Sequence, residues 1–131
     1  MTRIGKGLGD LNTLSVAVPQ SVPVNSKAQI LITSIGICAG SGGSILNGLD
    51  VDMLFTGELS HHEALAAIEQ GKVVVTAFHS NTEREYLKQR MINKLSRHID
   101  DEHYQVGKYD LAVSQVDRDP FEVVIAGAKE W

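Results

Sequence analysis

The segment VVVTAFHSNTER, residues 73–84, joins an apolar run to a polar helix start. Three consecutive valines are β-branched and apolar, and a short run of this kind is typical of a strand that is buried on both faces. The Ser-Asn-Thr-Glu pattern at 80–83 is typical of the first turn of a helix. We therefore predict a strand over 72–78 and a helix over 81–99, with His79 between them.

Two further strand-to-helix units precede this one. Apolar runs predict strands at 14–18, 30–38, 53–56, 109–114 and 121–125. Helices are predicted at 44–48 and 60–70, and a loop at 20–27, whereas the glycine-rich residues 2–10 predict no regular element. Strands that alternate with helices predict an α/β (α+β) fold, a single domain over 1–131 with a mixed sheet covered by helices. Functional groups in such sheets gather beyond the C-terminal ends of the strands.

Composition and charge exclude several classes of protein. Of the 131 residues, 43% are hydrophobic and 21% charged, which allows a packed core. The net charge of -4 argues against direct nucleic-acid binding, which requires a basic surface. No apolar run approaches the roughly 18 residues of a membrane span. The single cysteine, Cys38, is typical of a reducing compartment, so we expect a cytoplasmic or nuclear location.

His79 and Glu83 have two interpretations. Imidazole and carboxylate groups suit Zn, Mn or Fe, so the pair could ligate one divalent cation. Two ligands are too few for a closed site, and others would have to come from elsewhere. Alternatively, residues 80–83 form a capping box in which Glu83 bonds a backbone N–H and binds no metal. The metal interpretation predicts that the two side chains converge at the C-terminal edge of the sheet.

A second polar group surrounds the next helix start. Ser60 and Glu63 are spaced as a capping box, and His61 and His62 occupy the first helical turn. The two histidines could donate to an anionic substrate, ligate metal or move protons near neutral pH, or they could be ordinary solvated histidines. Glu58 could act as a general base, as an acceptor for a histidine N–H, or simply as a surface carboxylate. We name Glu58 and His61 as candidate catalytic residues.

A turn of very small residues links the strand at 30–38 to the helix at 44–48. Its backbone N–H groups could bind an anion, so the candidate anion contacts are Gly40, Ser41, Gly42 and Gly43. The turn lacks the lysine of a nucleotide-binding loop, and it could instead be a tight turn that needs positive φ. Arg118, in a charged turn, could pair with a neighbouring carboxylate or join the anion contacts.

Four motifs together resemble one known family. They are ICAGSGGS at 37–44, LFTGELSHHEAL at 54–65, FHSNTER at 78–84 and DRDP at 117–120. In this order they resemble the C-terminal half of the NIF-three-like (NGG-one-interacting-factor-three-like) family, and its eukaryotic branch above all. The resemblance covers residues 11–125.

The resemblance implies an α/β protein of two intertwined halves that assembles into toroidal hexamers. It implies a dinuclear divalent-metal site (Zn, Mn or Fe) between the halves, with His79 and Glu83 as the ligands from the C-terminal half. The family's N-terminal half adds a histidine pair and an aspartate. This chain has no histidine before His61, so we expect a half-protein with an incomplete metal site.

Two functions follow from the resemblance. The first is the C-terminal portion of a metal-binding, hydrolase-like protein that is not catalytically competent alone. The alternative is a non-enzymatic interaction module associated with transcriptional co-regulators. In either case we expect a homo-oligomer, because surfaces meant for the absent half would be exposed. Whether the chain is an enzyme is left open.

Overall fold

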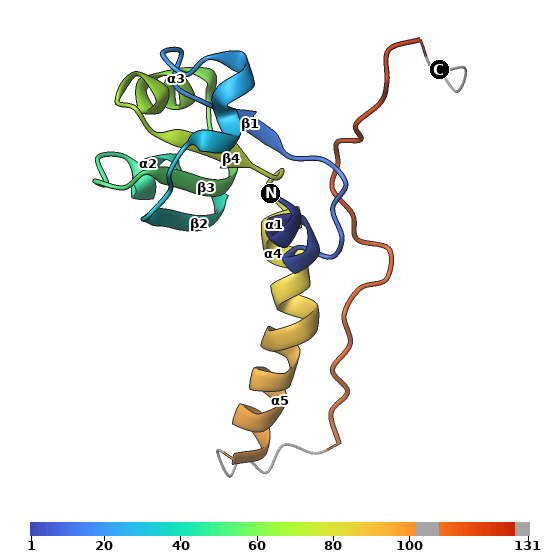
Figure 1. The fold of residues 1–131 in the computed structure, drawn as a ribbon. Coiled ribbons are helices and arrows are strands. Elements are labelled where there is room, and N and C mark those ends of the chain that lie inside the picture. Colours follow the sequence, from blue (N-terminus) through green and yellow to red (C-terminus); the bar gives the residue numbers. More distant parts are fainter. Residues whose placement is uncertain (102–107, 128–131) are drawn as a thin grey trace.

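A computed structural model of the chain describes residues 1–101 and 108–127. Its centre is a four-stranded sheet in the order β1-β4-β3-β2 (Figure 1). The strands are β1 (Ser15–Ala17), β2 (Ile35–Ser41), β3 (Met53–Glu58) and β4 (Val73–Thr76). Strands β2, β3 and β4 run parallel, and β1 pairs antiparallel with β4. The predicted α/β class with a mixed sheet is therefore confirmed.

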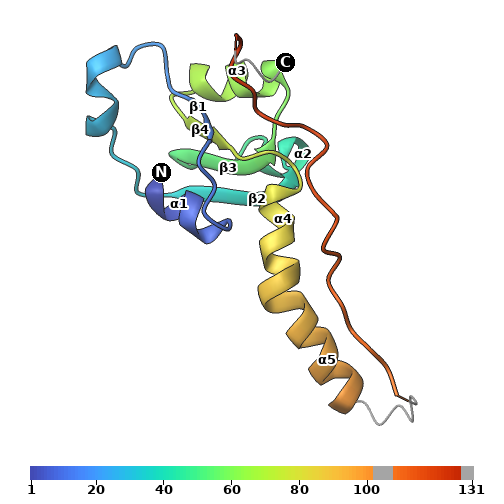
Figure 2. The ribbon, with the colours of Figure 1, turned by 90° about the vertical axis from the view of Figure 1, so that its right-hand side faces the viewer.

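Helices cover both faces of the sheet (Figure 2). Helices α2 (Gly43–Leu46) and α3 (His61–Glu69) lie on one face, and α1 (Thr2–Gly7) lies on the other. A longer helix leaves the sheet and consists of α4 (Asn81–Tyr86), the π-helical turn η2 (Leu87–Met91) and α5 (Ile92–Asp101). A 3₁₀ helix, η1 (Val24–Gln29), lies in the segment predicted as a loop. Residues 108–117 run back beside the long helix, and residues 118–127 continue past its start (Figures 1 and 2).

The core explains why three valines follow one another in β4. Val74 packs with Leu46, Leu54 and Ala67 under α2 and α3. Val73 and Val75 point to the opposite face and pack with Met53. All three valines are buried, as expected for a parallel strand that is covered on both sides. Because β4 runs parallel to β3, its C-terminal end and the residues that follow lie at the sheet edge predicted to hold the site.

Strand β2 begins at Ile35, five residues later than predicted. The Oδ2 atom of Asp52 accepts hydrogen bonds from the backbone N–H groups of Thr33 at 2.7 Å and Ser34 at 2.9 Å. It also accepts from both hydroxyl groups, at 2.6 and 3.0 Å. These bonds, above all the one from the Thr33 hydroxyl, lower the pKa of Asp52 to about 2. Because the two N–H groups are bound to a carboxylate, they are not available for sheet pairing.

The two late strands, at 109–114 and 121–125, were predicted wrongly. Both segments lack strand structure, and their backbones pair with none of the strands in the described part of the chain. Their apolar residues favour extended conformations, but a strand also requires a partner edge. The helix at 2–7 was missed because its two glycines, Gly5 and Gly7, are poor helix formers. No helix within residues 1–101 or 108–127 is long and apolar enough to cross a membrane.

Candidate metal site

The chain between β4 and α4 takes an unusual backbone path that places His79. Phe78 has φ of +64°, in the left-handed region where bulky residues are rare. Such a conformation costs roughly 1–2 kcal/mol for a residue with a Cβ atom. The turn brings His79 beside Glu58, the last residue of β3, and beside Glu83 in the first turn of α4.

The imidazole of His79 lies between two carboxylates. Its Nδ1 is 2.7 Å from Oε1 of Glu58, and its Nε2 is 3.5 Å from Oε1 of Glu83. An ionised carboxylate only accepts hydrogen bonds, so Nδ1 carries the proton and the neutral ring keeps its lone pair on Nε2. That lone pair is the one beside Glu83. A metal-binding histidine commonly has this arrangement, with the second nitrogen bonded to a carboxylate.

The separation of Nε2 and the Glu83 oxygen suits a shared cation. At 3.5 Å the two atoms are farther apart than an ordinary hydrogen bond requires. Two ligand atoms each bound about 2.0–2.1 Å from one tetrahedral Zn²⁺ would lie roughly 3.3–3.4 Å apart. The donor set, one imidazole nitrogen and one carboxylate oxygen, also suits Zn, Mn or Fe. Both the geometry and the chemistry of this pair therefore fit a divalent cation.

The surrounding carboxylates raise the pKa of His79. The hydrogen bond to Glu58 is the largest cause, and the negative charges of Glu83, Glu58 and Asp119 add to it, while desolvation opposes it. A proton on Nε2 competes with a cation for the same lone pair. Cation binding should therefore strengthen as the pH rises through the raised pKa of His79, and weaken below it.

Two glycines allow the chain to approach this pair closely. Gly40 has φ of +66°, and a Cβ atom there would be 2.8 Å from Oε1 of Glu83 and 2.9 Å from Nε2 of His79. A Cβ atom at Gly57 would be 2.9 Å from Cα of His79 and 2.7 Å from the carbonyl oxygen of Gly40. A side chain at position 40 would therefore occupy the space directly beside the two candidate ligand atoms.

Hydrogen bonds connect the glycine turn to both neighbouring elements. The buried hydroxyl of Thr56 in β3 donates to the carbonyl oxygen of Gly40 at 2.9 Å. The N–H of Gly40 donates to the hydroxyl oxygen of Thr82 at 2.8 Å, and that hydroxyl donates to the carbonyl oxygen of His79 at 2.7 Å. The ends of β2 and β3 and the start of α4 are therefore held together around His79.

The structure distinguishes the two candidate capping boxes. At α3 the box is present: the N–H of Ser60 donates to Oε2 of Glu63 at 2.8 Å, and the N–H of Glu63 donates to Oγ of Ser60 at 3.3 Å. At α4, Ser80 has helical backbone angles and makes no side-chain capping bond. The capping interpretation of Glu83 was wrong, because its carboxylate lies beside His79.

The other candidate catalytic residue, His61, lies in the first turn of α3. Its ring contacts that of His62 edge-to-face, with centroids 5.5 Å apart, and both side chains are exposed. Glu58, in contrast, is a direct hydrogen-bond partner of His79. Of the two residues predicted for proton transfer, Glu58 is the one that the structure brings into contact with the candidate metal ligands.

The predicted anion contacts are distributed over several environments. The N–H of Gly40 is bonded to Thr82, and the carboxylate of Glu63 lies against Gly43, where a Cβ atom would collide with it. Ser41 is exposed, and Gly42 is the buried N-cap residue of α2. Arg118 is exposed and remote from this turn in the sequence. Gly40 has a positive φ, as expected if this segment is simply a tight turn. Anion binding by these residues stays a prediction.

Arg84 was not recognised as important from the sequence. Its Nε donates to Oδ2 of Asp117 at 2.7 Å, and its Nη1 lies 3.9 Å from Oδ2 of Asp119. Asp117 and Asp119 flank Arg118 in the sequence and could have paired with it. In the structure they face Arg84 and compensate its charge. The contact fixes residues 117–119 beside the start of α4. A basic residue next to Glu83 is the only local signal, and its partners are 33 and 35 positions away, which local patterns do not reveal.

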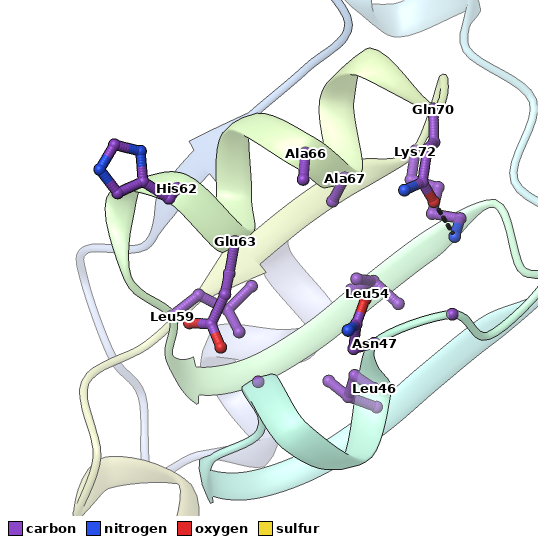
Figure 3. Close-up of a pocket in the computed structure, with 12 residues that line it drawn as sticks. Leu46, Asn47, Leu54, Leu59, His62, Glu63, Ala66, Ala67, Gln70 and Lys72 are labelled. Atoms are coloured by element: carbon purple, nitrogen blue, oxygen red, sulfur yellow. Dashed lines mark hydrogen bonds between the residues drawn. The ribbon is translucent and has the colours of Figure 1, made fainter.

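A pocket of about 240 Å³ lies between α2 and α3 (Figure 3). Its floor is apolar and includes Leu46, Leu54 and Ala67. Glu63 stands at one end but is engaged in the helix cap, and Lys72 at the other end donates to Gln70 at 2.7 Å. Neither His79 nor Glu83 lines this pocket, so we place the candidate site at the histidine instead.

Within residues 1–101 and 108–127, no group of three or more His, Cys, Asp or Glu side chains is arranged to hold one metal ion. Glu58 and Glu83 lie at opposite nitrogens of the same ring and cannot share a cation bound at Nε2. A cation at Nε2 would therefore meet His79 and Glu83, and metal binding by this pair stays a prediction.

Comparison with known proteins identifies the family. Residues 10–120 match the family described as Duf34/NIF3 (NGG1p interacting factor 3). The chain belongs to the Duf34/NIF3 family. It is 46% identical over 89 residues to the Schizosaccharomyces pombe protein NIF3 homolog, covering 68% of the chain and 31% of that protein. It is 41% identical over 90 residues to human NIF3-like protein 1, covering 69% of the chain and 22% of the human protein.

A third Duf34/NIF3 relative is the Saccharomyces cerevisiae NGG1-interacting factor 3, 42% identical over 97 residues, covering 72% of the chain and 31% of that protein. The chain thus spans less than a third of the length of each of these relatives. A solved Bacillus cereus protein related to NIF3 superposes with a TM-score of 0.69 at 22% identity, over 92% of the chain and 30% of that structure. This likeness confirms the fold.

Proposed function

We propose that this Duf34/NIF3 chain supplies two ligands, His79 and Glu83, to a divalent-cation site in a metal-dependent, hydrolase-like protein. The observation that supports this is the position of Nε2 of His79, 3.5 Å from Glu83 and held by Glu58 at the opposite nitrogen. A bound Zn²⁺, Mn²⁺ or Fe²⁺ would lower the pKa of a water ligand and polarise a phosphoryl or amide-type bond.

Each residue around the imidazole has a separate role in this proposal. Nε2 of His79 and the carboxylate of Glu83 bind the cation. The carboxylate of Glu58 accepts a hydrogen bond from the Nδ1–H group of His79, which fixes the ring orientation and increases the basicity of Nε2. Gly40 leaves the space beside both ligand atoms open. The remaining ligands come from outside the described residues, so the two-ligand site alone should bind cations weakly.

The proposal is tested by the substitution Glu83→Gln. A neutral amide is a poor ligand, so calorimetric titration with Zn²⁺ should show affinity reduced by roughly tenfold or more. Because Glu83 makes no helix-capping bond, the free energy of unfolding should change by less than about 0.5 kcal/mol. Glu69→Gln on α3 is a matched control and should leave the affinity unchanged. Equal Zn²⁺ affinity in the Glu83→Gln and Glu69→Gln variants would contradict a ligand role.

A second candidate function, a protein-interaction module, is favoured by the free edge of β2. Among the described residues this strand pairs with β3 alone, and its side chains Ile35 and Ile37 are 48% and 68% exposed. An unpaired edge with exposed apolar residues is a template for association. The yeast relative is named for interaction with NGG1. We propose that this edge mediates self-association, and that a transcriptional co-regulator is the class of protein partner.

Self-association is measured by sedimentation at micromolar concentration and high salt, where screened charges contribute little. The chain should sediment as a dimer or larger assembly, and Ile37→Lys should convert it to a monomer. Ile45→Lys is the control, because Ile45 is similarly exposed, at 65%, but lies on α2. A monomer in the unmodified chain would show that the edge does not mediate assembly.

A further inference from the structure

A hollow of about 560 Å³ adjoins the candidate metal site on the side of Phe78. Its walls come from the segment before β1, from the turn between β4 and α4, and from residues 118–123. Its volume is within the range of sites for small molecules, about 300–1,000 Å³. Phe78 and Asn81 line the hollow and lie on either side of His79 in the chain, so the hollow and the candidate site are neighbours.

Two phenylalanines line this hollow. Phe78 has φ of +64°, a conformation that glycine would adopt without strain and that a bulky residue adopts at a cost of roughly 1–2 kcal/mol. A costly side chain directly before a candidate metal ligand indicates a role that glycine could not perform. Phe121 is 74% exposed and also lines the hollow. The two side chains offer apolar surface to a planar ring.

The cation in this hollow is Arg118. In the described residues no ion pair joins Arg118 to a carboxylate, because its neighbours Asp117 and Asp119 face Arg84 at 2.7 and 3.9 Å. The charge of Asp119 in the wall is thereby compensated by Arg84. Glu122 also lines the hollow and carries the remaining negative charge. A guanidinium group that is not paired within the protein can bind a phosphate or carboxylate group of a ligand.

We propose that this hollow binds an aromatic ring that carries one phosphate group, with Arg118 at the phosphate and Phe78 and Phe121 at the ring. This inference rests on the proposed function, because it names aryl phosphates as the substrate class of the metal site at His79. Binding in the hollow uses none of the candidate metal ligands, so it can be measured without a cation.

The experiment is an NMR titration of the whole chain in EDTA with three probes: phenyl phosphate, inorganic phosphate and phenol. Phenyl phosphate should bind with saturable shifts at Phe78, Phe121 and Arg118. Inorganic phosphate and phenol, which each lack one of the two recognised groups, should bind roughly tenfold more weakly.

Substitutions separate the contribution of the phosphate contact from that of the ring contact. Arg118→Gln should weaken phenyl phosphate binding by roughly tenfold and leave phenol unchanged, because a charged hydrogen bond is lost. Phe121→Ala should weaken phenyl phosphate and phenol but not inorganic phosphate. Glu122→Gln should tighten phenyl phosphate binding, since a like charge is removed. Arg90→Gln, in η2, is the control and should change nothing.

Equal affinity for phenyl phosphate and inorganic phosphate would overturn the aromatic contact, and an unchanged Arg118→Gln variant would overturn the phosphate contact. All three substituted side chains that line the hollow, Arg118, Phe121 and Glu122, are exposed, so the variants should fold normally. Because EDTA removes free cations, the measured affinity for phenyl phosphate does not depend on whether His79 and Glu83 bind metal. Loss of aryl phosphate binding with Zn²⁺ binding intact would refute the hollow and leave the metal proposal standing.

Discussion

Gly40→Ala should weaken Zn²⁺ binding by roughly tenfold or more, because the new methyl group would lie 2.8 Å from Oε1 of Glu83 and 2.9 Å from Nε2 of His79. Both contacts involve the ends of side chains that can rotate away. The collision is therefore relieved by separating the two candidate ligands, and metal affinity should fall more than stability does. Calorimetric Zn²⁺ titration and urea unfolding measure the two effects.

Gly48 provides a matched control for this substitution. Its φ is +80°, and a Cβ atom there would have no heavy atom within 4 Å. Gly48→Ala should therefore suffer the same backbone penalty, about 1–2 kcal/mol, without loss of metal affinity. If both alanine variants bind Zn²⁺ equally well, Gly40 does not face the metal site.

Thr56→Val should destabilise the chain by about 1–3 kcal/mol, measured by urea unfolding. Valine has nearly the same shape, but it cannot donate to the carbonyl oxygen of Gly40, which accepts from the fully buried hydroxyl of Thr56 at 2.9 Å. A buried carbonyl group would then lose its partner, and the glycine turn beside His79 would lose its connection to β3.

The control for this variant is Thr76→Val in the adjacent strand. Thr76 is the register partner of Thr56 but is only half-buried. Its replacement should change the free energy of unfolding by less than about 0.5 kcal/mol, because valine is favoured in strands. Equal stability of the two valine variants would mean that the bond to Gly40 contributes nothing measurable.

Local patterns in the sequence predicted much of this fold. The valine run of β4 requires cover on both faces, and that requirement predicted a parallel strand with the polar residues at its C-terminal end. The capping box at Ser60 and Glu63 was predicted from spacing alone and is present. The family resemblance, rather than spacing, favoured the metal interpretation of His79 and Glu83.

Contacts between distant residues could not be predicted in this way. Glu58 and His79 are 21 positions apart, and they meet only because β3 and β4 pair in parallel. Gly40 and Thr82 are 42 positions apart. The late start of β2 depends on Asp52, which lies in a different turn and takes the N–H groups of Thr33 and Ser34. Hydrophobic periodicity contains no information about such a carboxylate.

The most direct test of the metal site is an NMR experiment in which Mn²⁺ is added in less than stoichiometric amount and paramagnetic line broadening is measured residue by residue. We predict that broadening begins at His79, Glu83 and Gly40, and that it strengthens as the pH rises through the raised pKa of His79. Broadening that is centred on the exposed pair His61 and His62, with the resonances of His79 still sharp, would contradict cation binding by His79 and Glu83.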